Sequence, residues 1–233
     1  MRRLLVILAA AFLLGAVALP PATAAKSEPR VFPPSSHPYG LSYGEWQARW
    51  FKWFIEIPVA ENPALDETGA KCNVGQTGRV WFTAATFSLT TTRSCTISEK
   101  QAVLVFALGN ECSDIEPPPF FGDNEADLRE CAAAGFDEFW PTPPSITVDG
   151  VAVPDITRFR TQTPVFGYTL PEDNLFGAPA GTTATMAVSD GIAVMLKPLS
   201  AGRHRIVISY ESPFLPGPGT TTYDLTVLDK HEH

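Results

Sequence analysis

Tryptophan is the most distinctive residue type in this sequence with chemistry to offer. Trp46, Trp50 and Trp53 are spaced by four and three residues, so a helix would stack three indoles on one face. Indole faces bind sugar rings and other flat ligands, and Trp81 and Trp140 extend the set of candidates. The same spacing is also typical of a helix face that packs against a sheet. Both interpretations stay open, and the five tryptophans are the candidate ligand-binding aromatics.

Two pairs of arginines form a second candidate binding surface. Arg158 and Arg160 alternate, as do Arg203 and Arg205, so each pair points to one side of its predicted strand. If the two strands are neighbours, the four guanidinium groups form a cationic strip. Such a strip suits an anionic ligand, for example a uronic acid or a phosphate-bearing glycan. The alternative is an ordinary solvent-facing surface with cross-strand pairing to acidic residues.

Acidic and hydroxyl side chains make a hydrolase the rival function. A glycosidase needs two carboxyl groups across a cleft, and the candidates near predicted strand ends are Asp149, Asp155, Asp190 and Glu211. The sequence selects no pair among them. Residues 40–44 match the G-x-S-x-G motif of α/β-hydrolases, but only a proline-rich segment precedes them. Because Ser42 is explained better as a helix cap, the catalytic residues stay unassigned.

Metal ligands do not form a complete set in the sequence. Asp123, Glu125 and Asp127 alternate as in a calcium loop, yet Leu128 stands where an EF-hand needs glycine and Ala134 where it needs glutamate. The first turn of a helix accounts better for these three acids. A calcium site of another type stays open as an alternative, because three more acids lie close in sequence: Glu111, Asp114 and Glu116.

The four histidines add no metal motif. His37 lies in a proline-rich segment, and His204 shares the apolar face of its predicted strand with Ile206 and Ile208. His231 and His233 could lie on one side of an extended terminus and hold a metal, but a frayed C-terminus is favoured. We therefore predict no metal site and no cofactor.

The four cysteines predict two disulfides. In an oxidising compartment an even count implies pairing, and four cysteines allow three connectivities. We favour the sequential pairs Cys72–Cys95 and Cys112–Cys131. Each pair closes a loop of about 20 residues, which contributes about 3 kcal/mol in the chain-entropy model. A cysteine metal site is the weaker alternative because the sequence has no C-x-x-C spacing.

The N-terminus has the organisation of a cleavable signal peptide, residues 1–24. Arg2 and Arg3 precede an apolar run, and Ala22-Thr23-Ala24 is a small-residue cleavage site. The run of about 16 apolar residues is shorter than the roughly 20 that span a membrane. We therefore expect a secreted or periplasmic protein with no membrane span after cleavage.

Charge excludes some partners of the mature chain. Losing two arginines with the signal peptide changes the net charge from −8 to about −10. An acidic protein binds nucleic acid and anionic membranes poorly, because both carry negative charge. The expected partners are an extracellular glycan or another envelope component.

Local patterns place these residues on two helices and a series of strands. Ser42 and Glu45 form an S-x-x-E capping box ahead of a tryptophan-rich helix that ends before Pro58. A second, short helix is expected to begin at a cap, Asp123 or Asn124, and to stop at Gly135. Strands are expected over residues 79–85, 93–97, 101–108, 146–153 with a turn at Asp149-Gly150, 156–161, 165–170, 183–188, 192–196, 203–210 and 221–228.

These elements predict a mainly β fold. Short strands with regular turns favour an antiparallel, jelly-roll-like β-sandwich carrying the tryptophan-rich helix and the short second helix. Residues 25–40 are expected to form an extended proline-rich leader. Residues 41–230 are expected to form a single β-sandwich domain with a helical N-terminal part.

Two stretches carry a resemblance to known sequences. The first contains Trp46-x3-Trp50-x2-Trp53, then Asn62-Pro63-x2-Asp66-x2-Gly69, and then Cys72-Asn73-Val74-Gly75-Gln76-x-Gly78-x-Val80-Trp81-Phe82. The second is Asp190-Gly191-x3-Met195-Leu196-x-Pro198-Leu199-x2-Gly202-x-His204. Both are similar to segments of an uncharacterised family of secreted bacterial proteins. The resemblance covers most of the mature chain and implies export and a shared fold; it implies no activity.

The expected function is therefore a non-catalytic binding or envelope-associated protein outside the cytoplasm. Carbohydrate binding through exposed aromatics is one version of this hypothesis. A secreted carbohydrate-active or ester hydrolase with paired carboxylates is the first alternative, and a structural surface protein without a small ligand is the second.

Overall fold

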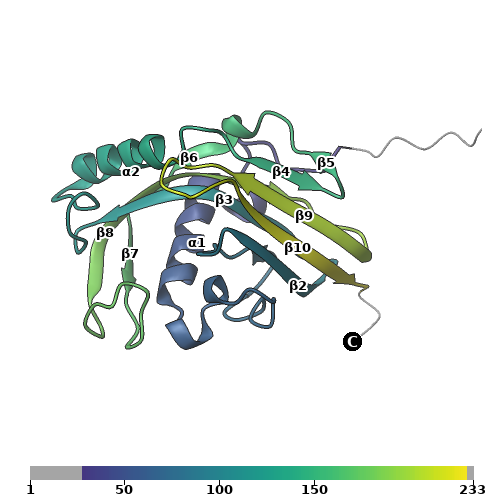
Figure 1. Ribbon diagram of the computed structural model, residues 1–233, viewed down its shortest axis with the longest axis horizontal. Coiled ribbons are helices and arrows are strands. Elements are labelled where there is room, and N and C mark those ends of the chain that lie inside the picture. Colours follow the sequence, from purple (N-terminus) through teal and green to yellow (C-terminus); the bar gives the residue numbers. More distant parts are fainter. Residues whose placement is uncertain (1–27, 230–233) are drawn as a thin grey trace, which may run out of the picture.

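The computed structural model describes residues 28–229, which form ten β-strands, two α-helices and four short 3₁₀ segments (Figure 1). The predicted signal peptide, His231 and His233 lie outside the described residues. No helix within the described range is both long and apolar enough to cross a membrane.

The strands form two five-stranded sheets that are open and mixed. The first sheet has the order β1 (Val80–Phe82), β3 (Ala102–Ser113), β8 (Thr183–Leu196) and β6 (Arg160–Gln162), and β7 (Phe166–Thr169) also pairs with β8. The second sheet has the order β2 (Thr90–Ser98), β10 (Gly219–Leu228), β9 (Gly202–Tyr210), β4 (Ser145–Val148) and β5 (Val151–Ala152).

The expectation of purely antiparallel sheets is wrong at two places. β1 pairs with β3 in parallel, and β2 pairs with β10 in parallel; the other pairings are antiparallel. The physical reason is connectivity. The chain leaves the first sheet after β1, forms β2 in the second sheet, and re-enters the first sheet at β3 in the direction of β1. The pairings establish a mainly β fold with two sheets and do not establish a jelly roll.

Helix α1 (Tyr43–Glu56) begins at the predicted capping box. The Ser42 hydroxyl accepts from the Glu45 amide, and the Glu45 carboxylate accepts from the Ser42 amide at 2.7 Å. The helix packs against β6, β7 and β8, beneath the arch that the sheets form (Figure 1). Its buried face holds Trp46, Trp50, Phe51 and Ile55, so the helix supplies a large part of the core.

Helix α2 (Glu125–Phe139) covers the other face of β3 and β8. Asn124, one of the two predicted caps, accepts from the amides of Ala126 and Asp127. The predicted stop at Gly135 is wrong, because the helix continues for one more turn. Gly135 serves packing instead: a β-carbon there would collide with the Asn110 side chain on β3.

Both predicted disulfides are present, Cys72–Cys95 and Cys112–Cys131. The first ties the loop before β1 to β2, and the second ties β3 to α2. Two disulfides are typical of a protein from an extracellular or otherwise oxidising compartment.

Three of the predicted strands differ from the structure. Residues 183–188 and 192–196 form one continuous strand, β8, rather than two. Residues 156–159 form a 3₁₀ segment, so only β6 remains of the strand expected there. The hairpin at Asp149-Gly150 is confirmed, and both turn residues have positive φ, 54° and 81°, as a type I′ turn requires.

Candidate functional site

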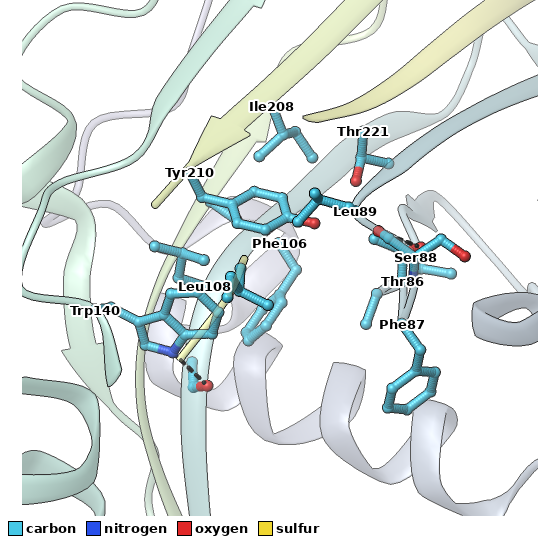
Figure 2. Close-up of a pocket in the computed structure, with 15 residues that line it drawn as sticks. Thr86, Phe87, Ser88, Leu89, Phe106, Leu108, Trp140, Ile208, Tyr210 and Thr221 are labelled. Carbon is cyan, nitrogen blue, oxygen red and sulfur yellow. Dashed lines mark hydrogen bonds between the residues drawn. The ribbon is translucent and has the colours of Figure 1, made fainter. Parts of the chain in front are cut away.

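A cleft of about 350 Å³ opens where β3 of one sheet approaches β9 and β10 of the other (Figure 2). This volume falls in the range of small-molecule sites. Loops before β2 and after β9 complete its walls. Its lining is mostly apolar: Ala84, Ala85, Thr86, Phe87, Ser88, Leu89, Phe106, Ala107, Leu108, Gly109, Trp140, Ile208, Tyr210, Leu215 and Thr221.

The Phe106 ring on β3 supports the cleft from the side of α1. The ring stacks on Trp50 with centroids 3.7 Å apart and an interplanar angle of 10°. It also lies over Gly109, where a β-carbon would come within 2.5 Å of the Phe106 Cζ atom. A bulge between Phe106 and Leu108 allows this overlap, because the extra residue brings Phe106 and Gly109 to the same face. The tryptophan stripe of α1 therefore underlies the cleft.

Tyr210 and Trp140 form an aromatic corner of the cleft. Their rings meet edge to face, with centroids 5.9 Å apart. The Trp140 indole N–H donates to the Gly109 carbonyl at 3.3 Å, which fixes the ring against β3. The Tyr210 ring lies flat over Gly219, where any β-carbon would overlap it. Burial raises the pKa of Tyr210, so its hydroxyl stays neutral at physiological pH.

Arg93 holds one wall of the cleft from behind. The side chain is 1% exposed, and all five of its N–H groups donate. The acceptors are four backbone carbonyls and one hydroxyl: Asp66 O, Ala64 O, Ala84 O, Ala85 O and Tyr223 Oη. Because Ala84 and Ala85 line the cleft, this buried cation shapes the wall. Its N–H groups are all bonded to the protein, and its charge acts on the lining only at a distance, where it lowers the pKa of Tyr210.

The polar side chains of the lining form hydrogen bonds within the protein. The Thr86 hydroxyl lies 2.7 Å from the Thr91 hydroxyl, and the Ser88 hydroxyl donates to Glu67. A hydrogen bond from Thr221 lowers the pKa of Tyr210 and partly offsets the effect of burial. Among residues 28–229, no acidic or basic side chain lines the cleft. Its chemistry is therefore that of a neutral, apolar cavity.

Two exposed phenylalanines lie in the loops before β2 and after β9, which supply part of the cleft lining. Phe87 is 68% exposed and lies near Phe54 of α1, with ring centroids 6.5 Å apart. Phe214, beside the lining residue Leu215, is 59% exposed and contacts Phe139 at the end of α2. Apolar surface therefore continues from the cavity onto its rim.

The five tryptophans do not form an exposed platform. Trp46, Trp50 and Trp81 are buried, and Trp53 is half-buried against the same core. The indole N–H groups of these four residues donate to internal acceptors: Pro38 O, Thr83 O, Val74 O and Asn73 Oδ1. The packing interpretation thus accounts for the stripe, and only Trp140 lines the cleft.

The predicted cationic strip does not form. Arg160 lies on β6 and Arg158 on the 3₁₀ segment before it, whereas Arg203 and Arg205 lie on β9 in the other sheet. Three of the four have an acidic partner: Arg158 pairs with Asp155, Arg160 with Asp190 and Asp137, and Arg205 with Asp224. The expectation fails because the sheet assignment of each strand is a long-range property.

The carboxylate candidates lie apart, in ion pairs or loops. Asp190 is buried beside Arg160, with an Nε–Oδ1 distance of 2.9 Å. Asp155 begins the 3₁₀ segment with a left-handed backbone, and Glu211 is exposed after β9. Asp149 contacts His204 at 2.7 Å. These positions give no pair of carboxyl groups across a cleft.

His204 resembles the base of a serine hydrolase only in that its ring lies between an aspartate and a serine hydroxyl. Its Nδ1 faces Asp149, and its Nε2 lies 3.3 Å from the Ser200 hydroxyl. The Ser200 carbonyl is closer to the same Nε2 atom, at 2.9 Å. A carbonyl only accepts, so Nε2 must carry a hydrogen and cannot take the serine proton. The cluster fastens the β8–β9 loop to the Asp149 turn. Ser42 of the G-x-S-x-G match is the cap of α1.

A buried carboxyl pair was not predicted from the sequence. The apolar run ending at Leu108 predicts the end of a strand, but β3 continues to Ser113 and carries Glu111 into the interior. Burial raises the pKa of Glu111 well above its ordinary value, and the neighbouring Glu116 raises it further. The hydrogen bond between the two raises the pKa of Glu111 and lowers that of Glu116, so Glu111 holds the proton.

The other predicted acids have structural partners. Glu125 pairs with Arg129 at 2.7 Å, and Asp127 accepts from the Asn124 side chain. The described part of the chain contains no group of three or more histidine, cysteine or acidic side chains placed to hold a metal ion.

Comparisons with known proteins give no assignment. No protein-family model matches the sequence, and no curated protein matches it. Three solved structures are similar over about two thirds of the chain. The cysteine protease inhibitor EhICP2 from Entamoeba histolytica is 13% identical, with 64% of this chain and 96% of that chain covered and a TM-score of 0.22.

Amebosin is 10% identical, with 65% of this chain and all of that chain covered and a TM-score of 0.22. PbICP-C, in complex with falcipain-2, is 13% identical, with 66% of this chain and all of that chain covered and a TM-score of 0.20. At these TM-scores the likeness supports no function.

Proposed function

We propose that this is a non-catalytic binding protein of the secreted or periplasmic space, and that the cleft between β3, β9 and β10 holds its ligand. One observation carries the proposal: an apolar cavity of about 350 Å³ lies between the sheets, and its lining includes the exposed Phe87. Export is supported by the predicted signal peptide and by the two disulfides.

Binding is favoured over hydrolysis on access and geometry. Glu111 and Glu116 are adjacent carboxyl groups, but Glu111 is 9% exposed, so a glycosidic oxygen cannot approach it. This pair therefore does not support the rival hydrolase. A structural surface protein needs no cavity of this size, whereas a binding protein does.

Two glycine substitutions, one at the start of β10 and one in the loop before it, test the use of the cleft. In Gly219→Ala the new methyl group overlaps the Tyr210 ring, so this lining ring must leave its position. Gly217→Ala is the matched control, because a β-carbon there meets nothing within 4 Å. A small-molecule library is screened by thermal shift on the wild type and both variants. Compounds that stabilise the wild type and Gly217→Ala should fail to stabilise Gly219→Ala.

Either of two results would overturn the proposal. If the screen yields no stabilising compound, or if every hit stabilises Gly219→Ala equally, the cleft is not a binding site. Near-ultraviolet circular dichroism of both variants checks that the fold is intact. The export part is checked separately, by sequencing the N-terminus of the protein recovered from outside the cytoplasm, which should begin near residue 25.

A further inference from the structure

We infer that the ligand of the cleft is a small, neutral, predominantly apolar molecule with a flat ring system, and neither a sugar nor an organic anion. The inference rests on the proposed function and names the chemical class that this site would accept. It replaces the carbohydrate version of the binding hypothesis.

Charge is the first argument. Acidic and basic side chains are missing from the lining within residues 28–229, and the nearest buried cation, Arg93, has each N–H group committed to a protein acceptor. A carboxylate or phosphate in the cavity would lose its water without gaining a hydrogen bond from a cationic side chain, which is costly. The cavity therefore rejects anions, even though a guanidinium lies behind its wall.

Hydrogen-bonding capacity is the second argument. The hydroxyls of Thr86 and Ser88 and the indole N–H of Trp140 are already paired within the protein. A sugar ring brings several hydroxyls, and each of them would lose hydrogen bonds to water that these groups cannot replace. An apolar ligand loses none. One hydroxyl or carbonyl on the ligand is compatible with the Tyr210–Thr221 side of the cavity.

Shape is the third argument. Phe106, Tyr210 and Trp140 place aromatic rings on adjacent sides of the cavity, and the Trp50 stack holds Phe106 in place. Aromatic rings pack best against other flat or cyclic groups, in offset or edge-to-face contact. Phe87, which is part of the lining, extends the apolar surface to the exterior. A ring system seated here would pack against aromatic rings on more than one side.

A matched pair of fluorescent probes tests the inference. N-Phenyl-1-naphthylamine is neutral, and 8-anilinonaphthalene-1-sulfonate has the same rings with one negative charge. Each probe is titrated into the mature protein, alongside a panel of oligosaccharides followed by tryptophan fluorescence. The neutral probe should bind at least about tenfold more tightly than the sulfonate, a difference of about 1.4 kcal/mol. Oligosaccharides should leave the tryptophan fluorescence unchanged.

Variants locate the binding. Gly219→Ala should abolish binding of the neutral probe, and Gly217→Ala should retain it. Leu215→Asp places a charge in the surface loop at the mouth and should weaken binding without disturbing the core. Leu65→Asp, at an exposed leucine outside the lining, is its control and should bind normally. The Leu215 variant keeps the test decisive if Gly219→Ala does not fold.

The outcomes separate the two proposals. If the sulfonate or an oligosaccharide binds as tightly as the neutral probe, and Gly219→Ala abolishes that binding, the cleft is a binding site but the inferred ligand class is wrong. If the neutral probe binds equally to all four variants, it is not in the cleft and the inference fails. If no probe or library compound binds, both proposals fail.

Discussion

Strand β3 passes through two buried environments that differ in their polarity. Near Phe106 and Gly109 it borders a neutral cavity in which the protein leaves space between its two sheets. A few residues on, Glu111 and Ser113 sit in a packed polar cluster with Glu116 and Tyr168. The first region is apolar and open, and the second is titratable and filled.

This difference in polarity determines which groups each region can leave without a partner. An apolar cavity leaves no hydrogen bond unmade, so it can stay empty until a ligand enters. A buried carboxyl group needs partners, and the Tyr168 hydroxyl donates to Ser113, whose hydroxyl donates to Glu116. Among residues 28–229 only two buried side-chain atoms are left without a partner, Gln47 Oε1 and Glu111 Oε1.

The two residues that carry these atoms, Gln47 and Glu111, are both neighbours of Ser189. Gln47 donates to the Ser189 hydroxyl at 3.1 Å, and Glu111 pairs with Ser189 across β3 and β8. Side chains of paired residues share a face of the sheet. A protonated Glu111 is the form suited to this site, because its hydroxyl can donate where a carboxylate could only accept.

The largest expected effect comes from removing the cation behind the cleft. Arg93→Met removes the donor to three backbone carbonyls and to the Tyr223 hydroxyl, and it leaves the Ala84 carbonyl with only its hydrogen bond from Tyr223. We expect a loss of about 3 kcal/mol or more in the free energy of unfolding. Urea denaturation measures it. Arg205→Met, at an exposed ion pair on β9, should unfold like the wild type. Equal midpoints for the two variants would show that Arg93 does not hold the wall.

The second-largest effect is a pH-dependent change in stability, expected at the polar cluster around Glu111. The folded state raises the pKa of Glu111, so its contribution to stability is complete below the ordinary value and is lost as pH rises through the raised value. Glu111→Gln removes this loss. The melting temperature of the variant should therefore increasingly exceed that of the wild type between pH 4 and pH 8. Glu130→Gln, at an exposed position on α2, is the control, and a pH-independent gap for Glu111→Gln contradicts the assignment.

The smallest expected effects come from two serine-to-alanine substitutions, one at a buried serine and one at a helix cap. Ser113→Ala removes the buried hydroxyl between Tyr168 and Glu116, and we expect a loss of about 1–3 kcal/mol. Ser42→Ala removes the cap of α1 and should cost about 1 kcal/mol. Thermal or urea unfolding ranks the two. Probe binding in the cleft should survive both, and a smaller loss for Ser113→Ala would show that the polar cluster is less tightly coupled than its burial implies.

Much of the local structure could be predicted, and the candidate site could not. The cap at Ser42, the Asp149-Gly150 turn and the two disulfides follow from residues close in sequence. The cleft joins β3 to Tyr210 and Thr221, about a hundred residues later. Trp140 was the only candidate residue that lines it, and nothing in its sequence context distinguished it from the four tryptophans in the core.

The sequence alone was enough for features that depend on residues close together in the chain. These are the starts of the helices, the hairpin turn and the pairing of the cysteines. The tertiary structure was needed to show which aromatic rings are buried, which arginines pair with which acids, and that burial raises the pKa of Glu111. The physical reason is that burial and electrostatics depend on neighbours brought together by strand pairing between distant segments. One residue of extension in β3, or one bulge beside Phe106, changes those neighbours without any local signal.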